Sequence, residues 1–241
     1  MLKLSLLLGV AAALADVAGA FVLVKAENVQ RYLRYFVALG AGFLMATSVL
    51  EMLPESLKLD IKLAPVLVMA GYCAVHFLEH TINAHFHFGK ETHHGEFVSQ
   101  HTSYSVMGGL AVHALFDGVA IGSGFAINSM LGWLIFLAIF LHKAPEGFTM
   151  ASIMLASGAS RRTALLSAVV LAAATIVGVL VIGLAPGMVR FGLPISAGVA
   201  LYVAATDLVP EVNREPGIRM ALVFFAGIAG FLLLRMLLPT V

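Results

Sequence analysis

TALLSAVVLAAATIVGVLVIGL, the stretch from Thr163 to Leu184, contains no ionisable side chain. Its length matches the roughly 20 apolar residues that an α-helix needs to cross the hydrocarbon core of a bilayer. Backbone polar groups in lipid must be paired within one helix or in a closed barrel. Barrel strands are alternating segments of about ten residues, whereas this run is continuous. The stretch therefore predicts a transmembrane helix.

Seven further apolar runs of similar length predict an all-α integral membrane protein with eight transmembrane helices. Of the 241 residues, 61% are hydrophobic and 11% are charged, whereas soluble domains have about half and about a quarter. The net charge of +1 gives no argument for a nucleic-acid partner, and the single cysteine, Cys73, excludes an intramolecular disulfide. The expected spans are residues 2–24, 35–53, 64–86, 104–126, 130–155, 163–184, 192–211 and 219–238.

The N-terminus resembles a secretory signal peptide, with Lys3, an apolar run and small residues from Ala18 to Ala20. We expect it to be retained, because the apolar run continues to Val24 and completes a full span. Lysine and arginine prefer cytoplasmic loops, and this bias favours both termini outside. In that topology the inside set is Lys25, Arg31, Arg34, Lys90, Arg161, Arg162, Arg214 and Arg219. The smaller outside set is Lys3, Lys58, Lys62, Arg190 and Arg235.

A short repeat relates the second and seventh spans. Residues 51–55 read EMLPE and residues 207–211 read DLVPE, so both follow the pattern acid-x-x-Pro-Glu. The two spans run in opposite directions in the expected topology, and inverted repeats are common in secondary transporters. The alternative is a pair of ordinary helix ends solvated by water. The candidate gate carboxylates, which would attract cations by charge, are Glu51, Glu55, Asp207 and Glu211.

The fourth and fifth spans each pair a histidine with a carboxylate four positions later. These pairs are His113 with Asp117, and His142 with Glu146. Residues four apart lie on one face of a helix. Two such faces opposed to each other would present two imidazoles and two carboxylates. This donor set suits Zn²⁺, and it also suits Cd²⁺, Fe²⁺ or Mn²⁺.

These four residues fall near the middle of their spans, and so does Lys143. Inserting Asp117, Lys143 and Glu146 without partners would cost about 8–10 kcal/mol, so we expect them to face the interior of the bundle. A purely structural alternative is a buried ion pair of Lys143 with Glu146 or Asp117. That alternative leaves two histidines at mid-membrane depth unexplained. The acidic residue of the first span, Asp16, is assigned no role.

The motifs HALFDG at residues 113–118 and HKAPEG at residues 142–147 resemble the metal-binding fourth and fifth helices of the ZIP (Zrt-/Irt-like protein) transporters. Residues 42–56 and 198–211 resemble that family's second and seventh helices. The resemblance implies a ZIP-like bundle with an inverted repeat of helices 1–3 and 6–8. It also implies divalent-metal transport toward the cytoplasm, placement in the cytoplasmic membrane with both termini outside, and a homodimer.

The chain departs from the family's two-metal pattern at two positions beside the histidines. Ala114 stands where that pattern has asparagine, and Lys143 stands where it has an acidic or polar residue. The sixth span, which can add a carboxylate, has none. Lys143 points about 100° away from His142 on a helix, where its ammonium would replace a second cation. Some ZIP subgroups share this His-Lys-x-Pro form. We expect a single-metal site of His113, Asp117, His142 and Glu146, charge-balanced by Lys143 at net −1.

A histidine-containing cytoplasmic loop is expected at residues 87–103 within a single transmembrane domain of residues 1–241. Histidine-rich tracts can bind metal, so this region is a candidate acceptor for delivered ions. The alternative is a solvated loop without that function. The candidate ligands are His85, His87, His93 and His94.

Two functions other than transport remain open. A membrane-embedded zinc-dependent hydrolase needs three protein ligands and an open position for water, which the four donors could supply. Against it, the sequence has no His-Glu-x-x-His motif and no serine beside the two histidine motifs. A metal-responsive receptor without a transport cycle is the other alternative. We expect a transporter rather than an enzyme, with lipid and divalent metal ions as its partners.

Overall fold

The computed structural model describes residues 2–25, 30–82, 99–214 and 218–238, and all regular structure in these ranges is helical. Eight helical segments in the described part of the chain are long and apolar enough to cross a membrane. This confirms the predicted fold class. The segments are Leu2–Leu23, Tyr32–Leu59, Leu63–Thr81, Gln100–Ile127, Ser129–Ala156, Arg161–Leu184, Pro186–Arg214 and Ile218–Leu237.

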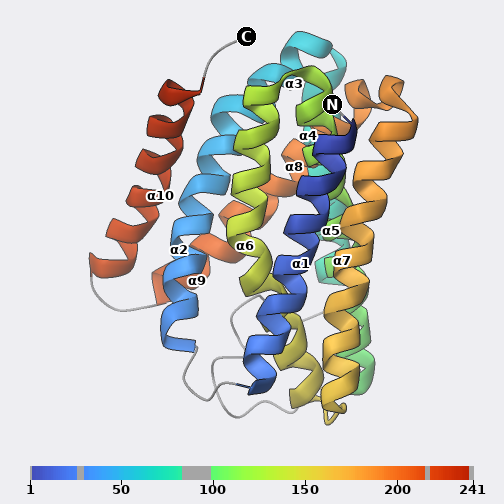
Figure 1. Cartoon of the computed structure of the whole chain (residues 1–241), viewed down its shortest axis with the longest axis vertical. Coiled ribbons are helices and arrows are strands. Elements are labelled where there is room, and N and C mark those ends of the chain that lie inside the picture. The colour runs from blue at the N-terminus through green and yellow to red at the C-terminus, as the bar shows by residue number, and fades with distance from the viewer. Residues whose placement is uncertain (1, 26–29, 83–98, 215–217, 239–241) are drawn as a thin grey trace.

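The spans form an elongated bundle in which successive segments run in opposite directions (Figure 1). Helix α1 begins and α10 ends at one end of the bundle, called here the terminal end. Within the described ranges, two spans contain a π-helical turn. The helices are α1 (Leu2–Lys25), α2 (Gln30–Thr47), α3 (Leu53–Leu59), α4 (Leu63–Ile82), α5 (Gln100–Ile127), α6 (Ser129–Ala156), α7 (Arg161–Leu184), α8 (Val189–Tyr202), α9 (Val209–Arg214) and α10 (Ile218–Leu237). The π turns are η1 (Ser48–Met52) and η4 (Val203–Leu208), and a 3₁₀ turn, η3 (Pro186–Met188), precedes α8.

The second span is longer than predicted, because the helix continues through Pro54 to Leu59. Proline lies in the first turn of α3, where its missing N–H group is tolerated. The π turn η1 directly precedes it and adjusts the local hydrogen-bond pattern. Loss of apolar character after residue 53 therefore marks a change of surroundings rather than the end of the helix. Helix α5 likewise begins at Gln100, inside the expected histidine loop.

Glycines let the helices that carry the predicted site approach their neighbours backbone to backbone. A methyl group on Gly118 of α5 would lie 1.9 Å from the carbonyl oxygen of Thr175 on α7. A methyl group on Gly147 of α6 would lie 1.9 Å from the carbonyl oxygen of Asp16 on α1. Such small-residue contacts hold membrane helices together where the hydrophobic effect cannot. Helices α5 and α6 are thereby fixed against α7 and α1.

Packing follows the inverted repeat expected for helices 1–3 and 6–8. Helix α2 packs on α10, and α8 packs on α4. Gly42 and Gly227 bring the first pair together, and Gly198 and Gly71 bring the second pair together. Gly42 and Gly198 are 156 positions apart, and so are Gly71 and Gly227. The same residue offset therefore relates the crossing of α2 with α10 to the crossing of α8 with α4.

Helices α4 and α10 are the least buried of the candidate spans in the described residues and expose large apolar side chains, and Figure 1 shows α10 at the edge of the bundle. Cys73 of α4 is also exposed. Helix α6 is the most enclosed of the candidate spans in the described residues. The exposed apolar surface suits contact with lipid. It includes Val66, Met69 and Phe77 of α4, and Leu222, Phe225, Leu233 and Met236 of α10.

Candidate metal centre

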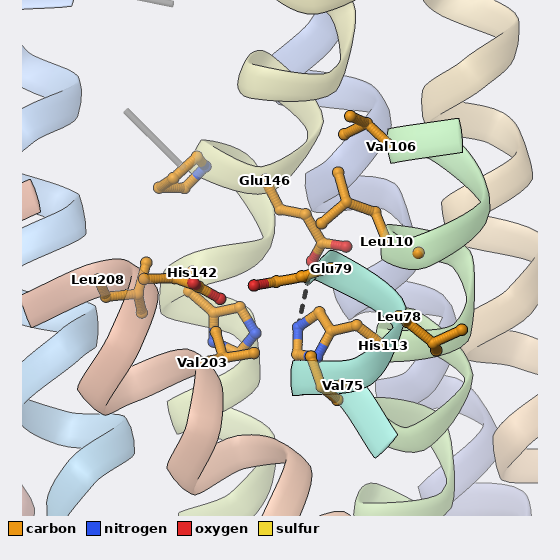
Figure 2. Close-up of a pocket in the computed structure, with 13 residues that line it drawn as sticks. Val75, Leu78, Glu79, Val106, Leu110, His113, His142, Glu146, Val203 and Leu208 are labelled. Atoms are coloured by element: carbon orange, nitrogen blue, oxygen red, sulfur yellow. Dashed lines mark ion pairs between the residues drawn. The ribbon is translucent and has the colours of Figure 1, made fainter. Parts of the chain in front are cut away.

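The four predicted donor residues converge between the antiparallel helices α5 and α6. Each helix contributes one histidine and one carboxylate a single turn apart, and all four side chains are buried. One potential ligand atom from each residue lies within 4.8 Å of the others. Figure 2 shows His113, His142 and Glu146 directed toward a common space. The four residues are His113, Asp117, His142 and Glu146.

The distances between donors approach those around a tetrahedral ion. The Nε2 atom of His113 lies 3.2 Å from Asp117 Oδ2, and that of His142 lies 3.4 Å from the same oxygen. His113 Nε2 lies 4.0 Å from Glu146 Oε2 (Figure 2, dashed line). Zinc bonds of about 2.0–2.2 Å place tetrahedral donors roughly 3.3–3.6 Å apart. Modest side-chain movement would therefore close the group around one divalent ion.

The imidazole of His142 is oriented by its own helix. Its Nδ1 atom lies 2.8 Å from the carbonyl oxygen of Ala138 one turn earlier. Because a carbonyl only accepts, Nδ1–H donates and the lone pair of Nε2 faces the site, as in metal-binding histidines. Within the described residues, His113 Nδ1 and Glu146 Oε1 are buried without a hydrogen-bond partner. Buried polar atoms of this kind suit a site that binds a ligand.

Lys143 is fully buried beside the donors. Its Nζ atom lies 2.7 Å from Glu146 Oε2 and 3.0 Å from Asp117 Oδ2. The buried ion pair considered as a structural alternative is therefore present, and it involves two of the metal-donor candidates. The ammonium and a bound divalent ion would share these carboxylates. The structural and the metal-binding interpretations thus concern the same atoms.

Asp16 belongs to this cluster, although no role was predicted for it from the sequence. Its carboxylate is fully buried on α1, and Oδ2 lies 3.6 Å from Lys143 Nζ. With Asp117 and Glu146, it brings the formal charge of the group to −2 rather than the expected −1. The contact joins residues far apart in the chain, so no local spacing indicates it. The available signal was an isolated carboxylate in the middle of an apolar span.

A cavity extends from the four-donor group to a second acidic pair (Figure 2). His113, His142 and Glu146 line one part of it, and Glu79 and Asp207 line another. The Tyr202 hydroxyl donates to Glu79 over 2.8 Å, and Tyr202 directly precedes η4, the turn that carries Asp207. The remaining lining is largely apolar. This cavity leads from the middle of the bundle toward the end opposite to the terminal end, where α4 ends.

The four candidate gate carboxylates have different surroundings. Asp207 is buried and lines the cavity. Glu51 is buried and forms an ion pair with Arg235 of α10. The other two pair within their own helices, Glu55 with Lys58 at 2.5 Å and Glu211 with Arg214 at 3.0 Å. The loop candidates His85, His87, His93 and His94 lie outside the described residues.

Residues 99–235, more than half of the chain, match the family model described as ZIP zinc transporter. The chain is 32% identical over 108 residues to zinc transporter zipt-7.1 of Caenorhabditis briggsae, covering 42% of this chain and 28% of the relative. It is 32% identical over 137 residues to human zinc transporter SLC39A7, covering 52% and 29%. Human zinc transporter ZIP5 is 36% identical over 129 residues, covering 51% and 24%. The chain thus spans less than a third of the length of these relatives.

The matched region contains α5 and α6 with both histidine motifs, together with η4 and its acidic pattern. The family model describes transporters, which argues against the hydrolase alternative. With eight candidate spans, a buried group of two histidines and two carboxylates, and a family match over most of these elements, the chain belongs to the ZIP zinc transporter family.

Proposed function

We propose that this chain moves Zn²⁺ toward the cytoplasm through one intramembrane site of His113, Asp117, His142 and Glu146. The observation that carries the proposal is the convergence of these buried donors inside a bundle of membrane-spanning length. Ionisable groups at this depth are costly and typically functional. A divalent ion would give each of them a partner. Zinc is the cargo named for the family and for the relatives.

The proposed site holds a single ion. Lys143 offsets one of the three negative charges of Asp16, Asp117 and Glu146, so a formal charge of −2 is left for a divalent ion to neutralise. Support comes from the Lys143 ammonium, which contacts both carboxylate donors where a second cation would otherwise bind. Membership of the subgroup with His-Lys-x-Pro in the fifth helix is part of the proposal, and its support is the sequence of residues 142–145. Cd²⁺, Fe²⁺ and Mn²⁺ accept similar donors, so competition by these ions is part of the proposal.

In the proposed route, the cavity leads from the site to the cytoplasm past Asp207. This follows from a topology with both termini outside, in the cytoplasmic membrane, for which the lysine and arginine bias gives the support. The carboxylates Glu51, Glu55, Asp207 and Glu211 act as gates at the two ends. The loop histidines His85, His87, His93 and His94 accept delivered metal weakly.

A homodimer is also part of the proposal. Its support is the resemblance to the family, together with the exposed apolar faces of the peripheral helices α4 and α10. The exposed thiol of Cys73 on α4 offers a direct test by thiol cross-linking in native membranes. A cross-linked dimer that disappears in Cys73→Ala is expected if α4 lies near the interface. Chains that remain single by both cross-linking and native mass measurement would contradict the dimer.

The test of transport is Zn²⁺ uptake into proteoliposomes, with protein-free vesicles as the control. We expect saturable uptake that Cd²⁺, Fe²⁺ and Mn²⁺ reduce to different extents. Flux no greater than in protein-free vesicles, at verified incorporation, would contradict the proposal. Release of product from lipid or peptide substrates by the same protein would instead favour the hydrolase.

A further inference from the structure

The offset of 156 positions that relates the packing glycines also relates two pairs of ionisable residues. It relates Glu51 in η1 to Asp207 in η4, and Glu79 of α4 to Arg235 of α10. Asp207 and Glu79 both line the cavity. Glu51 and Arg235 form an ion pair near the terminal end. Equivalent positions thus hold two acids at one end of the bundle and an acid with a base at the other.

We propose that Arg235 is a built-in cation that closes the terminal end, so that an entering divalent ion must displace its guanidinium from Glu51. The inference rests on the proposed transport function for its consequence, but the ion pair itself does not depend on it. In the other half of the repeat, the position of Arg235 is taken by an acid. Two carboxylates attract a divalent cation, whereas an acid already paired with arginine does not.

Burial distinguishes this ion pair from the other pairs at the helix ends. The Glu51 side chain is 5% exposed, whereas that of Arg235 is 45% exposed. A buried carboxylate is costly without a partner of opposite charge. The long, half-exposed side chain of Arg235 can move its guanidinium into solvent, where water solvates the charge. The pairs of Glu55 and Glu211 lie within single helices and cannot join two spans.

The location of Glu51 gives the ion pair a role in access to the site. Its π turn η1 contacts α8 and also α6, the helix that carries His142 and Glu146. Glu51 is not among the residues that line the cavity, which reaches the acidic pair of the opposite half instead. The Arg235 pair therefore ties the peripheral helix α10 to η1, which itself contacts the helix that carries two of the donors.

Uptake kinetics test this inference with a matched control. Arg235→Gln should lower the half-saturating Zn²⁺ concentration about fivefold, because Glu51 no longer has a competing cation. Arg190 of α8 is the control. It pairs over 3.8 Å with Asp60, which directly follows α3, and both side chains are partly exposed. Arg190→Gln removes the same charge but leaves the Glu51 pair intact. Adding Glu51→Gln should abolish the effect of Arg235→Gln, whereas persistence of the effect would overturn the inference.

A second measurement is independent of flux. Ser48 is buried one turn deeper than Glu51, so Ser48→Cys in a Cys73→Ala background reports opening of the terminal end. Arg235→Gln should raise its labelling by a membrane-impermeant thiol reagent about threefold, with no rise in Arg190→Gln. No zinc flux together with this rise would refute transport and retain the closing role of Arg235. Normal flux with equal labelling and equal half-saturation in both variants would refute the role and retain transport.

Discussion

At the scale of single residues, Lys143 decides how many ions the site can hold. Its position beside His142 was evident from the sequence, and so was the choice between an ion pair and a second-cation substitute. The structure brings its ammonium to Asp117 and Glu146 and adds the contact to Asp16. That last contact joins α1 to α6 across most of the chain. The contact between Asp16 and Lys143 depends on how α1 packs against α6, and no short sequence motif predicts that packing.

Replacing Lys143→Asp should increase the metal bound within the membrane by about one ion per protomer, because an ammonium is exchanged for a donor. Elemental analysis of protein in detergent measures this, after the four loop histidines have been replaced to remove their contribution. The loop-silenced native protein should bind at most one ion. Two ions bound by that protein would show that Lys143 does not exclude a second cation.

Asp16→Asn should weaken equilibrium Zn²⁺ binding about tenfold, because residues that support metal ligands typically contribute this much. The loss of one carboxylate leaves Lys143 to compete more strongly for Asp117 and Glu146. Asp60→Asn is the control. Its carboxylate accepts from the amide of Leu63 at the start of α4, which lowers the pKa of Asp60, and it lies outside the spans. Equal affinities in the two variants would show that Asp16 plays no part in the site.

At the scale of elements, apolar runs predicted all eight spans, but they placed several helix ends too early. The second span was predicted to end at residue 53, yet it continues through Pro54 because η1 and α3 extend the same helix. The hydropathy of a side chain indicates whether it lies in lipid, protein or water, whereas the continuity of a helix depends on its backbone hydrogen bonds. The glycine that ends the first histidine motif, Gly118, contacts the backbone of α7.

Gly118→Ala should reduce the stability of the folded protein by about 1–3 kcal/mol, because the added methyl group would overlap the backbone of α7. Gly108→Ala on the same helix is the matched control, since its added methyl group would meet no atom of another described helix within 4 Å. Thermal unfolding in detergent should show a lower midpoint for the first variant alone. Identical midpoints would contradict the backbone contact between α5 and α7.

At the scale of the whole molecule, two helical motifs and an acidic repeat predicted both the site and the inverted architecture. Four buried donors came together because residues four apart share a helix face, which is a local property. The pairs that join distant spans, such as Glu51 with Arg235, required the folded structure. The 156-residue offset relates Glu51 and Arg235 to the acidic pair of the other half, and it becomes evident once the glycine crossings identify which helices correspond.

The histidine loop should tune transport without being required for it. Replacing His85, His87, His93 and His94 together by alanine should alter the apparent affinity only modestly, because the intramembrane donors remain intact. The measurement is Zn²⁺ uptake at several concentrations, compared with the native protein at equal incorporation. Complete loss of uptake in a folded variant would mean that the loop is an obligatory part of the route.

The most direct test of the four-donor site is Zn²⁺ flux into proteoliposomes that contain single alanine variants of its ligands. His142→Ala and Glu146→Ala should each lower the initial rate at least about tenfold, since changes to mere supporting residues already cost that much. His113→Ala and Asp117→Ala should behave alike, with incorporation and thermal unfolding matched to the native protein. Near-native flux in His142→Ala and Glu146→Ala under these conditions would contradict the proposal that zinc crosses the membrane through this site.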